Sequence, residues 1–257
     1  MKKMHNGWHV PDDDKKITFV LSNDNIMSNP SYEGKYRDMI LETIPSMKTF
    51  VDVGSNVGIW SLPMSKKFRR VVSYEPSKQN IECLRANVPS GIEIREKAVA
   101  NFSGTADFHQ AGKNCGDGKL CRPGVGSSYS VPVVRLDDEG IDEIDLIKID
   151  VQGWEYEVLD GAREIIKTQR PWIIFEVNED IDQCCKLMEK SGYETLLLKS
   201  KRCFLWAPIS GKNSVDKRHY GRYLGQGPYA KRLAGKKSPC CAVEQFLVCK
   251  LPIRKMG

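Results

Sequence analysis

Long apolar runs are missing from this sequence of 257 residues, and no stretch approaches the roughly 18 consecutive apolar residues of a membrane-spanning helix. The first eight residues include two lysines, but no apolar segment follows them, so we expect no secretory signal there. Hydrophobic residues make up 40% and charged residues 28%, which is typical of a soluble globular protein. We therefore expect a cytoplasmic protein with one domain of ordinary size plus extensions.

Patterns typical of zinc sites and disulfide frameworks are also missing. The nine cysteines are odd in number, include no C-x-x-C motif, and contain two adjacent pairs. The four histidines lie far apart in the sequence and near none of these pairs. These features favour reduced thiols in an intracellular protein over a zinc site or disulfides.

The segment Phe50–Gly58 lacks the G-x-G-x-x-G spacing of dinucleotide-binding folds. Its sequence, Phe-Val-Asp-Val-Gly-Ser-Asn-Val-Gly, is typical of a buried strand, a glycine turn and the start of a helix. The next apolar segment, Val71–Tyr74, ends at Glu75, whose carboxylate can accept hydrogen bonds from both hydroxyls of a ribose. S-adenosylmethionine (SAM) contains a ribose but no pyrophosphate, so it does not need the tighter glycine spacing. The motif therefore favours a class I methyltransferase over a dehydrogenase.

Apolar segments of strand length alternate with segments of helical spacing along the chain. Strands are predicted at 50–53, 71–74, 92–95, 105–109, 144–149, 172–177, 194–199 and 246–250, and helices at 36–44, 58–68, 77–87, 154–167 and 181–190. The alternation predicts an α/β protein with a Rossmann-like class I methyltransferase fold, in which a mostly parallel seven-stranded sheet carries helices on both faces. Asp52, Glu75 and Asp150 then fall at the carboxyl ends of strands, where such sheets bind ligands.

Three regions are predicted along the chain. Residues 1–48 form an N-terminal helical and irregular segment, residues 49–199 form the SAM-binding core, and residues 200–257 form a basic extension that completes the sheet. Within the core the alternation lapses between residues 100 and 136. The glycine- and serine-rich segment 114–128 is expected to form a lid over the substrate rather than a disordered loop.

Positive charge is concentrated at the C-terminal end. Residues 199–257 contain 14 Lys and Arg against Asp216 and Glu244, a net charge of +12, which leaves −6 for the rest of a chain whose total is +6. A basic tail at 199–237 could bind an anionic partner such as nucleic acid. The plain alternative is a solvated tail with no partner.

The expected cofactor contacts follow from the strand–turn–helix motif. Gly54 and Gly58 would let the backbone pass under the methionine part of SAM, and free N–H groups at the helix start after Asn56 would face its carboxylate. Asp52 would bind the methionine amine or, through water, the ribose, while Glu75 would bind the ribose hydroxyls. The plain alternative is an ordinary connection without a ligand. The predicted cofactor-binding set is Asp52, Gly54, Asn56, Gly58, Glu75 and Ala98.

The segment Ile144–Ala162 resembles the signature of FkbM-type methyltransferases, whose fourth strand typically runs K-I-D-V-E-G-x-E-x-x-V-L-x-G-A. The likeness covers roughly residues 48–178 and includes Asp52–Gly58, Tyr74–Pro76 and Pro171–Val177. One position departs from the pattern, because Gln152 stands where the family usually has Glu. Any role of that acid in activating substrate or holding a metal is therefore in doubt in this chain.

The resemblance implies a SAM-dependent O-methyltransferase that methylates a hydroxyl of a sugar, glycan, lipid or other small molecule by in-line transfer. Asp150 is the first candidate for the catalytic base or for a metal ligand. Glu176 and Asn178 are expected beside it at the end of the next strand, where an Asp/Glu/Asn oxygen cluster suits Mg²⁺, similar to catechol-type O-methyltransferases. Glu155 has two possible roles. It is either a second catalytic residue that contacts the substrate, or an acid in the first turn of its helix that complements the helix dipole.

Two other functions stay open. The acceptor could be RNA held by the basic tail, although the sequence has no N-P-P-Y-type motif for base amino groups. The chain could also be a catalytically inactive binding module, for which Gln152 is the only supporting feature.

Overall fold

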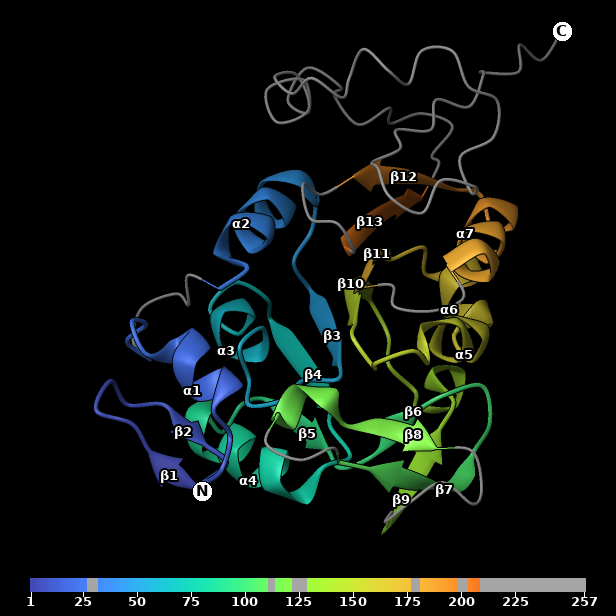
Figure 1. Cartoon of the computed structure of the whole chain (residues 1–257). Helices are drawn as coiled ribbons and strands as arrows, with labels where there is room; N and C mark the ends of the chain where they lie inside the picture. Colours follow the sequence, from blue (N-terminus) through green and yellow to red (C-terminus); the bar gives the residue numbers. More distant parts are fainter. Residues whose placement is uncertain (27–31, 111–113, 122–128, 177–180, 198–202, 209–257) are drawn as a thin grey trace, which may run out of the picture.

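The computed structural model describes residues 1–26, 32–110, 114–121, 129–176, 181–197 and 203–208. Its centre is a seven-stranded sheet with the order β12-β13-β11-β10-β3-β4-β5, and helices cover both faces of this sheet (Figure 1). The strands are β3 (Thr49–Val53), β4 (Arg70–Tyr74), β5 (Glu93–Arg95), β10 (Ile144–Ile149), β11 (Trp172–Glu176), β12 (Tyr193–Leu197) and β13 (Cys203–Pro208). β13 is antiparallel to both of its neighbours, and the pairs from β11 to β5 are parallel. The predicted Rossmann-like, mostly parallel seven-stranded sheet is therefore confirmed.

Both faces of the central strands are apolar. Phe50, Val71 and Leu146 pack into one core cluster, and the next residues along each strand pack into a second cluster on the opposite face. This division follows from the alternation of side chains along a strand. The helices are α1 (Lys16–Leu21), α2 (Gly34–Thr43), α3 (Ser61–Met64) and α4 (Lys78–Asn87), followed by α5 (Glu155–Asp160), α6 (Arg163–Thr168) and α7 (Ile181–Lys190).

Two predicted helices differ from the structure. The helix predicted at 154–167 is divided into α5 and α6 at Gly161, where a Cβ would lie 2.1 Å from the backbone oxygen of Ala100. Gly161 therefore packs directly against the backbone of Ala100. The two residues are far apart in the sequence, so the local pattern at 154–167 does not reveal this contact. The helix predicted at 58–68 is reduced to the four residues of α3.

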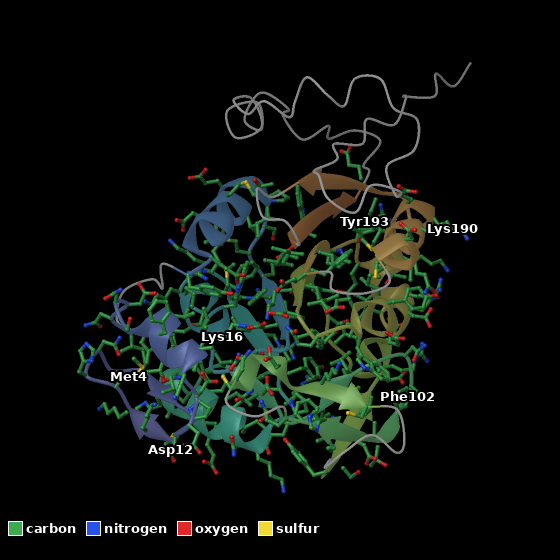
Figure 2. The ribbon with its side chains drawn as sticks, viewed as in Figure 1. Met4, Asp12, Lys16, Phe102, Lys190 and Tyr193 are labelled. Carbon is green, nitrogen blue, oxygen red and sulfur yellow. The ribbon has the colours of Figure 1, made fainter. Side chains whose placement is uncertain are left out.

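One strand of the sheet, β13, was not predicted. A strand was expected at 246–250, which is outside the described residues, whereas β13 at 203–208 joins the sheet between β11 and β12. Tyr193, at the start of β12, is fully buried (Figure 2), and its hydroxyl donates to the carbonyl oxygen of Pro171 at 2.9 Å. The division of the chain at residues 48 and 199 stays a prediction.

A second sheet was not predicted. β6 (Ala98–Val99), β7 (Gly104–His109), β8 (Lys119–Cys121) and β9 (Tyr129–Val134) form a four-stranded sheet in the order β6-β9-β7-β8. In Figure 1 it lies below the main sheet. The expectation of a loop throughout 114–128 is wrong, because η1 (Cys115–Asp117) is a short 3₁₀-helix and β8 is a strand. Residues 122–128 lie outside the described part.

The N-terminal segment packs on the main domain. β1 (Lys2–Lys3) and β2 (His9–Val10) pair antiparallel, and the backbone of His9 exchanges two hydrogen bonds with the side-chain amide of Asn87, at 2.7 and 2.8 Å. Trp8 and Leu21 are fully buried. Within the described ranges, no helix is both long enough and apolar enough to cross a membrane.

Candidate functional site

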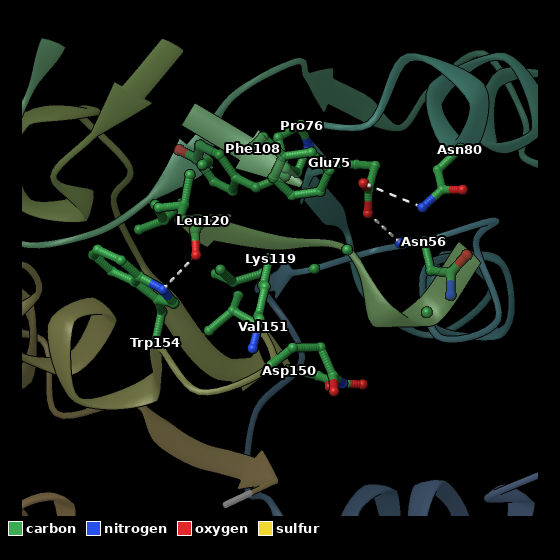
Figure 3. Close-up of a pocket in the computed structure, with 18 of the residues that line it drawn as sticks. Asn56, Glu75, Pro76, Asn80, Phe108, Lys119, Leu120, Asp150, Val151 and Trp154 are labelled. Atoms are coloured by element: carbon green, nitrogen blue, oxygen red, sulfur yellow. Dashed lines mark hydrogen bonds between the residues drawn. The ribbon is translucent and has the colours of Figure 1, made fainter. Parts of the chain in front are cut away.

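A pocket opens at the carboxyl ends of β3, β4 and β10 (Figure 3). Its walls come from the turns that follow these strands and from the second sheet with η1. Four residues of the predicted cofactor set line it, namely Gly54, Asn56, Glu75 and Ala98. Asp150, the predicted base, also lines it, whereas Asp52, Gly58, Glu155 and Glu176 are not among the lining residues. The fold thus gathers about half of the predicted site in one place.

Glu75 follows β4 and is only 5% exposed. Its Oε2 accepts the N–H of Asn56 at 2.8 Å, and its Oε1 accepts the N–H of Ser77 at 2.9 Å and the amide of Asn80 at 3.3 Å. Burial raises the pKa of Glu75 to about 7, although these hydrogen bonds favour the ionised form. A carboxylate has about four lone-pair sites, so this side chain keeps acceptor capacity at the pocket wall.

The turn after β3 passes very close to β10. Gly54 has a φ of 80°, and a Cβ there would lie 1.9 Å from the backbone oxygen of Asp150. Glycine is required at this position because of a neighbouring protein backbone, independently of any ligand. Asn56, with a φ of 52°, is the next left-handed residue, and its N–H is the group that Glu75 holds.

Gly58 and the expected helix start differ from the prediction. A Cβ on Gly58 would lie 2.9 Å from the side chain of Val88 and 3.0 Å from that of Leu84, so this glycine allows close packing against α4. The expectation of a free helix N-terminus after Asn56 is wrong. α3 begins only at Ser61, and the N–H of Asn56 is donated to a carboxylate.

Asp52 is fully buried behind the pocket wall. Its Oδ2 accepts the hydroxyl of Ser61 at 2.6 Å, and its Oδ1 lies 3.3 Å from Nζ of Lys148. Asp52 and Lys148 are register partners on the parallel strands β3 and β10, so their side chains share a face. The structure therefore gives Asp52 a role in joining two strands, in place of the expected contact with the methionine amine or ribose.

Lys148 connects several groups beneath the pocket. Its Nζ donates to the carbonyl oxygen of Gly54 at 2.8 Å and lies 3.7 Å from Oδ2 of Asp150. Burial lowers the pKa of Lys148, but the carboxylates of Asp52 and Asp150 outweigh burial, so the pKa is raised above its usual value. The ammonium group stays charged and ties the two turns together.

Asp150 stands directly after β10, and its side chain is 33% exposed. Figure 3 shows it across the pocket from Glu75. Its Oδ1 accepts the side-chain amide of Gln152 at 2.9 Å. Gln152 and Gly153 have φ angles of 55° and 96°, so the chain turns sharply here and the side chain of Gln152 folds back onto Asp150.

Glu155 faces the protein interior. It is 1% exposed, and its carboxylate accepts the N–H of Val151 at 3.3 Å and the N–H of Gly153 at 3.1 Å. Burial raises the pKa of Glu155 to about 7. These contacts agree with the alternative role at the start of the helix, whereas the predicted catalytic role would need a carboxylate at the pocket.

The predicted Mg²⁺ ligands are not gathered in the described structure. Glu176 ends β11 and does not line the pocket, and Asn178 lies outside the described residues. In the described part of the chain, no three His, Cys, Asp or Glu side chains are placed to share a metal ion. Asp150 faces the NH₂ group of Gln152 and the ammonium of Lys148, and neither of these donor groups binds a cation.

Some pocket residues were missed by the sequence analysis. Asn80 donates to Glu75 and, at 3.1 Å, to the carbonyl oxygen of Cys115. The thiol of Cys115 donates to Oδ1 of Asn56 at 3.1 Å, and its N–H donates to the carboxylate of Asp14. Asn80 could have been found from its place in the first turns of the helix after Glu75. Cys115 lies in a segment without periodicity, which carries no such signal.

The second sheet supplies an apolar wall of the pocket. Phe108 and Leu120 lie on it (Figure 3), and Ala98 of β6 also lines the pocket. Trp154 packs against the same cluster, and its indole N–H donates to the carbonyl oxygen of Leu120 at 3.0 Å. Trp154 therefore packs between the start of α5 and β8.

Glu33 is an acid near Lys148 and Asp150 that the sequence analysis did not assign to the site. It caps α2 with a left-handed φ of 57°, and the indole N–H of Trp60 donates to its Oε2 at 2.7 Å. Burial raises the pKa of Glu33, while the nearby charge of Lys148 lowers it and that of Asp150 raises it further. The local sequence pattern does not place Glu33 here, because its partner Trp60 lies 27 residues away in the chain.

The order of the main sheet, its antiparallel strand β13, the glycine turn after β3 and the acid after β4 define a class I methyltransferase fold. The likeness extends to a family. The model of the methyltransferase FkbM domain matches residues 52–195, which is more than half of the chain. The chain therefore belongs to the FkbM methyltransferase family.

Individual relatives are distant. The chain is 24% identical over 168 residues to Methyltransferase sdnD of Sordaria araneosa, a match that covers 48% of this chain and 64% of that protein. The chain thus matches less than two thirds of the length of this curated relative.

Two solved structures show similar folds. The methyltransferase FkbM from Methylobacillus flagellatus KT has a TM-score of 0.46 and 19% identity, with 63% of this chain and 43% of that chain covered. The magnesium protoporphyrin IX methyltransferase from Synechocystis PCC 6803, solved with bound SAM, has a TM-score of 0.44 and 11% identity, with 76% and 86% covered. At these TM-scores neither structure carries a further argument about this chain.

Proposed function

We propose that the pocket binds SAM and that the protein transfers the methyl group to a hydroxyl of a sugar, glycan, lipid or other small molecule. Glu75 is the observation that carries this proposal. It is a buried carboxylate at the end of the second parallel strand of an FkbM-family fold, it lines the pocket, and backbone N–H groups hold it in place. A rigid acceptor of this kind suits the two hydroxyls of a ribose.

The other pocket walls support the same cofactor. Ala98, Phe108 and Leu120 provide an apolar surface suited to an adenine ring. The turn at Gly54 and Asn56 borders the pocket beside Glu75, and Gly54 adds no side chain to this wall. When bound, SAM supplies a methyl group on a sulfonium, which is a good leaving group.

Asp150 supports transfer to a hydroxyl. It is partly exposed at the pocket, across from Glu75, and its carboxylate is held by Gln152. As the acceptor oxygen forms its bond to the methyl carbon, the electrons of the carbon–sulfur bond pass to sulfur and the hydroxyl proton passes to Asp150. Holding acceptor and methyl group in line contributes much of the rate.

Calorimetric titration of the purified chain with SAM and, separately, with NAD tests the cofactor. We expect SAM to bind, NAD not to bind, and Glu75→Ala to weaken SAM by about 100-fold, since hydrogen bonds to a charged acceptor contribute roughly 1.5–3 kcal/mol each. Glu189→Ala, on the exposed surface of α7, is the matched control and should leave SAM binding unchanged. Absence of SAM binding, or equal binding by Glu75→Ala, would refute the proposal. Binding then justifies a screen of hydroxylated acceptors with radiolabelled SAM.

RNA is the second candidate acceptor, because 14 Lys and Arg lie in residues 199–257. Apart from 203–208, this segment is outside the described residues. Binding of single-stranded RNA that weakens steeply with salt, together with methyl transfer to that RNA, would favour this acceptor over a small molecule. SAM binding without transfer to any acceptor class would favour a binding module.

A further inference from the structure

The acceptor side of the pocket is surrounded by hydrogen-bond donors. Oδ1 of Asp150 receives the amide of Gln152 at 2.9 Å, and Oδ2 lies 3.7 Å from the ammonium of Lys148. Lys148 is 7% exposed and is itself held by Asp52 and by the carbonyl oxygen of Gly54, so it is fixed in place. Both oxygens of the pocket carboxylate therefore face N–H donors, one of which, the ammonium of Lys148, carries a full positive charge.

The position of Gln152 is fixed by its own backbone. Its φ of 55° and the φ of 96° at Gly153 define a tight turn. Glu155 accepts the N–H groups on either side of Gln152, those of Val151 and Gly153. The amide of Gln152 is thus presented to Asp150 by a rigid turn and not by a free surface side chain.

We propose that Gln152 is a positioning residue that keeps divalent metal ions off Asp150 and leaves this carboxylate free to meet the acceptor hydroxyl. The acceptor side is then a metal-free site, in which the ammonium of Lys148 balances the charge of Asp150 and the amide of Gln152 donates a hydrogen bond to it. The role of the acceptor hydroxyl rests on the proposed function, whereas the exclusion of metal rests on the contacts of Asp150 alone.

A glutamate at residue 152 would change this balance. It would replace an amide donor by a second carboxylate next to Asp150, so that the pair offers oxygen acceptors only and carries one more negative charge. Hard divalent cations prefer clusters of carboxylate oxygens. The single change from amide to acid therefore decides whether this turn accepts a cation or excludes it.

Titration with Mn²⁺, followed by electron paramagnetic resonance, tests the proposal on the full chain. The variants are Asp150→Asn, Gln152→Glu and the double variant, with Ser90→Glu, at an exposed residue after α4, as a control for adding one carboxylate elsewhere. We expect Mn²⁺ binding by the wild type to be the same as by Asp150→Asn. We expect Gln152→Glu to bind Mn²⁺ at least about tenfold more tightly than either, because it adds a carboxylate oxygen ligand. The double variant should lose this gain, and Ser90→Glu should not show it.

Two results would overturn the proposal: Mn²⁺ binding by the wild type that Asp150→Asn abolishes, or no gain in Gln152→Glu over Ser90→Glu. Circular dichroism in the near ultraviolet shows whether each variant is folded. If Gln152→Glu unfolds, the comparison of Mn²⁺ binding between the wild type and Asp150→Asn still shows whether the native site binds a metal. SAM titration of the same samples reports separately on the proposed function, because the Mn²⁺ result needs no cofactor.

Discussion

The turn after β3 and the turn after β10 have similar structures, but the glutamates that hold them have different roles. Both contain left-handed residues, and both are held by a buried glutamate whose pKa is raised to about 7 by burial. Only one of the two glutamates lines the pocket. The paired contacts are Glu75 with the N–H groups of Asn56 and Ser77, and Glu155 with those of Val151 and Gly153.

The comparison shows that a raised pKa does not by itself mark a functional acid. The same cause, burial, acts on both glutamates, and the same kind of hydrogen bond opposes it in both. The difference lies in what each carboxylate faces: Glu75 faces a cavity, whereas Glu155 faces the start of its own helix. Access to a ligand therefore separates a binding role from a structural one.

The largest expected effect comes from breaking the contact between the two turns. Gly54→Ala would place a Cβ 1.9 Å from the backbone oxygen of Asp150, in a residue whose φ is 80°. Because a backbone atom cannot move aside cheaply, we expect the free energy of unfolding to fall by about 3 kcal/mol or more. Urea unfolding measures this change.

Gly140→Ala is the matched control for that experiment. Gly140 also has a positive φ, 62°, but a Cβ there would meet nothing within 4 Å. It should therefore cost only about 1 kcal/mol, from backbone strain alone. Equal losses in the two variants would mean that strain, and not the approach of the two turns, explains the glycine at residue 54.

Exchanging each glutamate for glutamine sharpens the comparison directly. Glu75→Gln should weaken SAM binding by about 100-fold, because the ribose hydroxyls lose a charged acceptor. Glu155→Gln should change SAM binding by less than about threefold, yet lower the free energy of unfolding by about 1–3 kcal/mol. Calorimetry and urea unfolding of both variants separate the effects. Similar losses of SAM affinity would remove the distinction between the turns.

The pH dependence of stability tests what the two turns have in common. Both glutamates have a folded pKa of about 7 against an ordinary value of 4.5. A raised folded pKa stabilises the protein fully below the unfolded pKa, and this stabilisation is lost as the pH rises to about 7. We therefore expect the free energy of unfolding to fall between about pH 4.5 and 7, and each glutamine variant to remove part of this slope.

SAM binding should show the opposite trend, and only for one turn. The ionised form of Glu75 is the better acceptor for ribose hydroxyls, so affinity should be about tenfold lower at pH 6 than at pH 8. Glu155→Gln should keep this dependence, and Glu75→Gln should abolish it. Titrations at the two pH values check both expectations, and a wild-type affinity independent of pH contradicts them.

The smallest expected effect concerns the link from the turn after β10 to the second sheet. Trp154→Phe removes the hydrogen bond to the carbonyl oxygen of Leu120 but keeps most of the apolar contact. We expect a loss of about 1 kcal/mol in the free energy of unfolding, and SAM affinity within about threefold of the wild type. A much larger loss of SAM affinity would assign Trp154 to the ligand instead.

The parallel strands were predictable because their signal is local. A short apolar run between turn residues indicates a strand buried on both faces, and β3, β4, β10 and β11 all have that form. In the second sheet only β7 was predicted, as the strand at 105–109. The signal was weaker for β9, which alternates buried and exposed residues, contains Pro132, and pairs with β6 and β7. The remaining strands of this sheet are recognised by their partners, which are distant in the sequence.

Among the predicted site residues, the sequence by itself determined which acids stand at the carboxyl ends of strands. Strand ends and turn residues are set by neighbours in the chain, so Asp52, Glu75 and Asp150 were placed at one edge in advance. Only the tertiary structure decided which of them a ligand can reach. Asp52 is turned inward by Lys148, its register partner on another strand, while Glu75 meets a wall supplied by a second sheet. Side-chain partners far apart in the sequence set this outcome, because burial and charge pairing depend on distances in space.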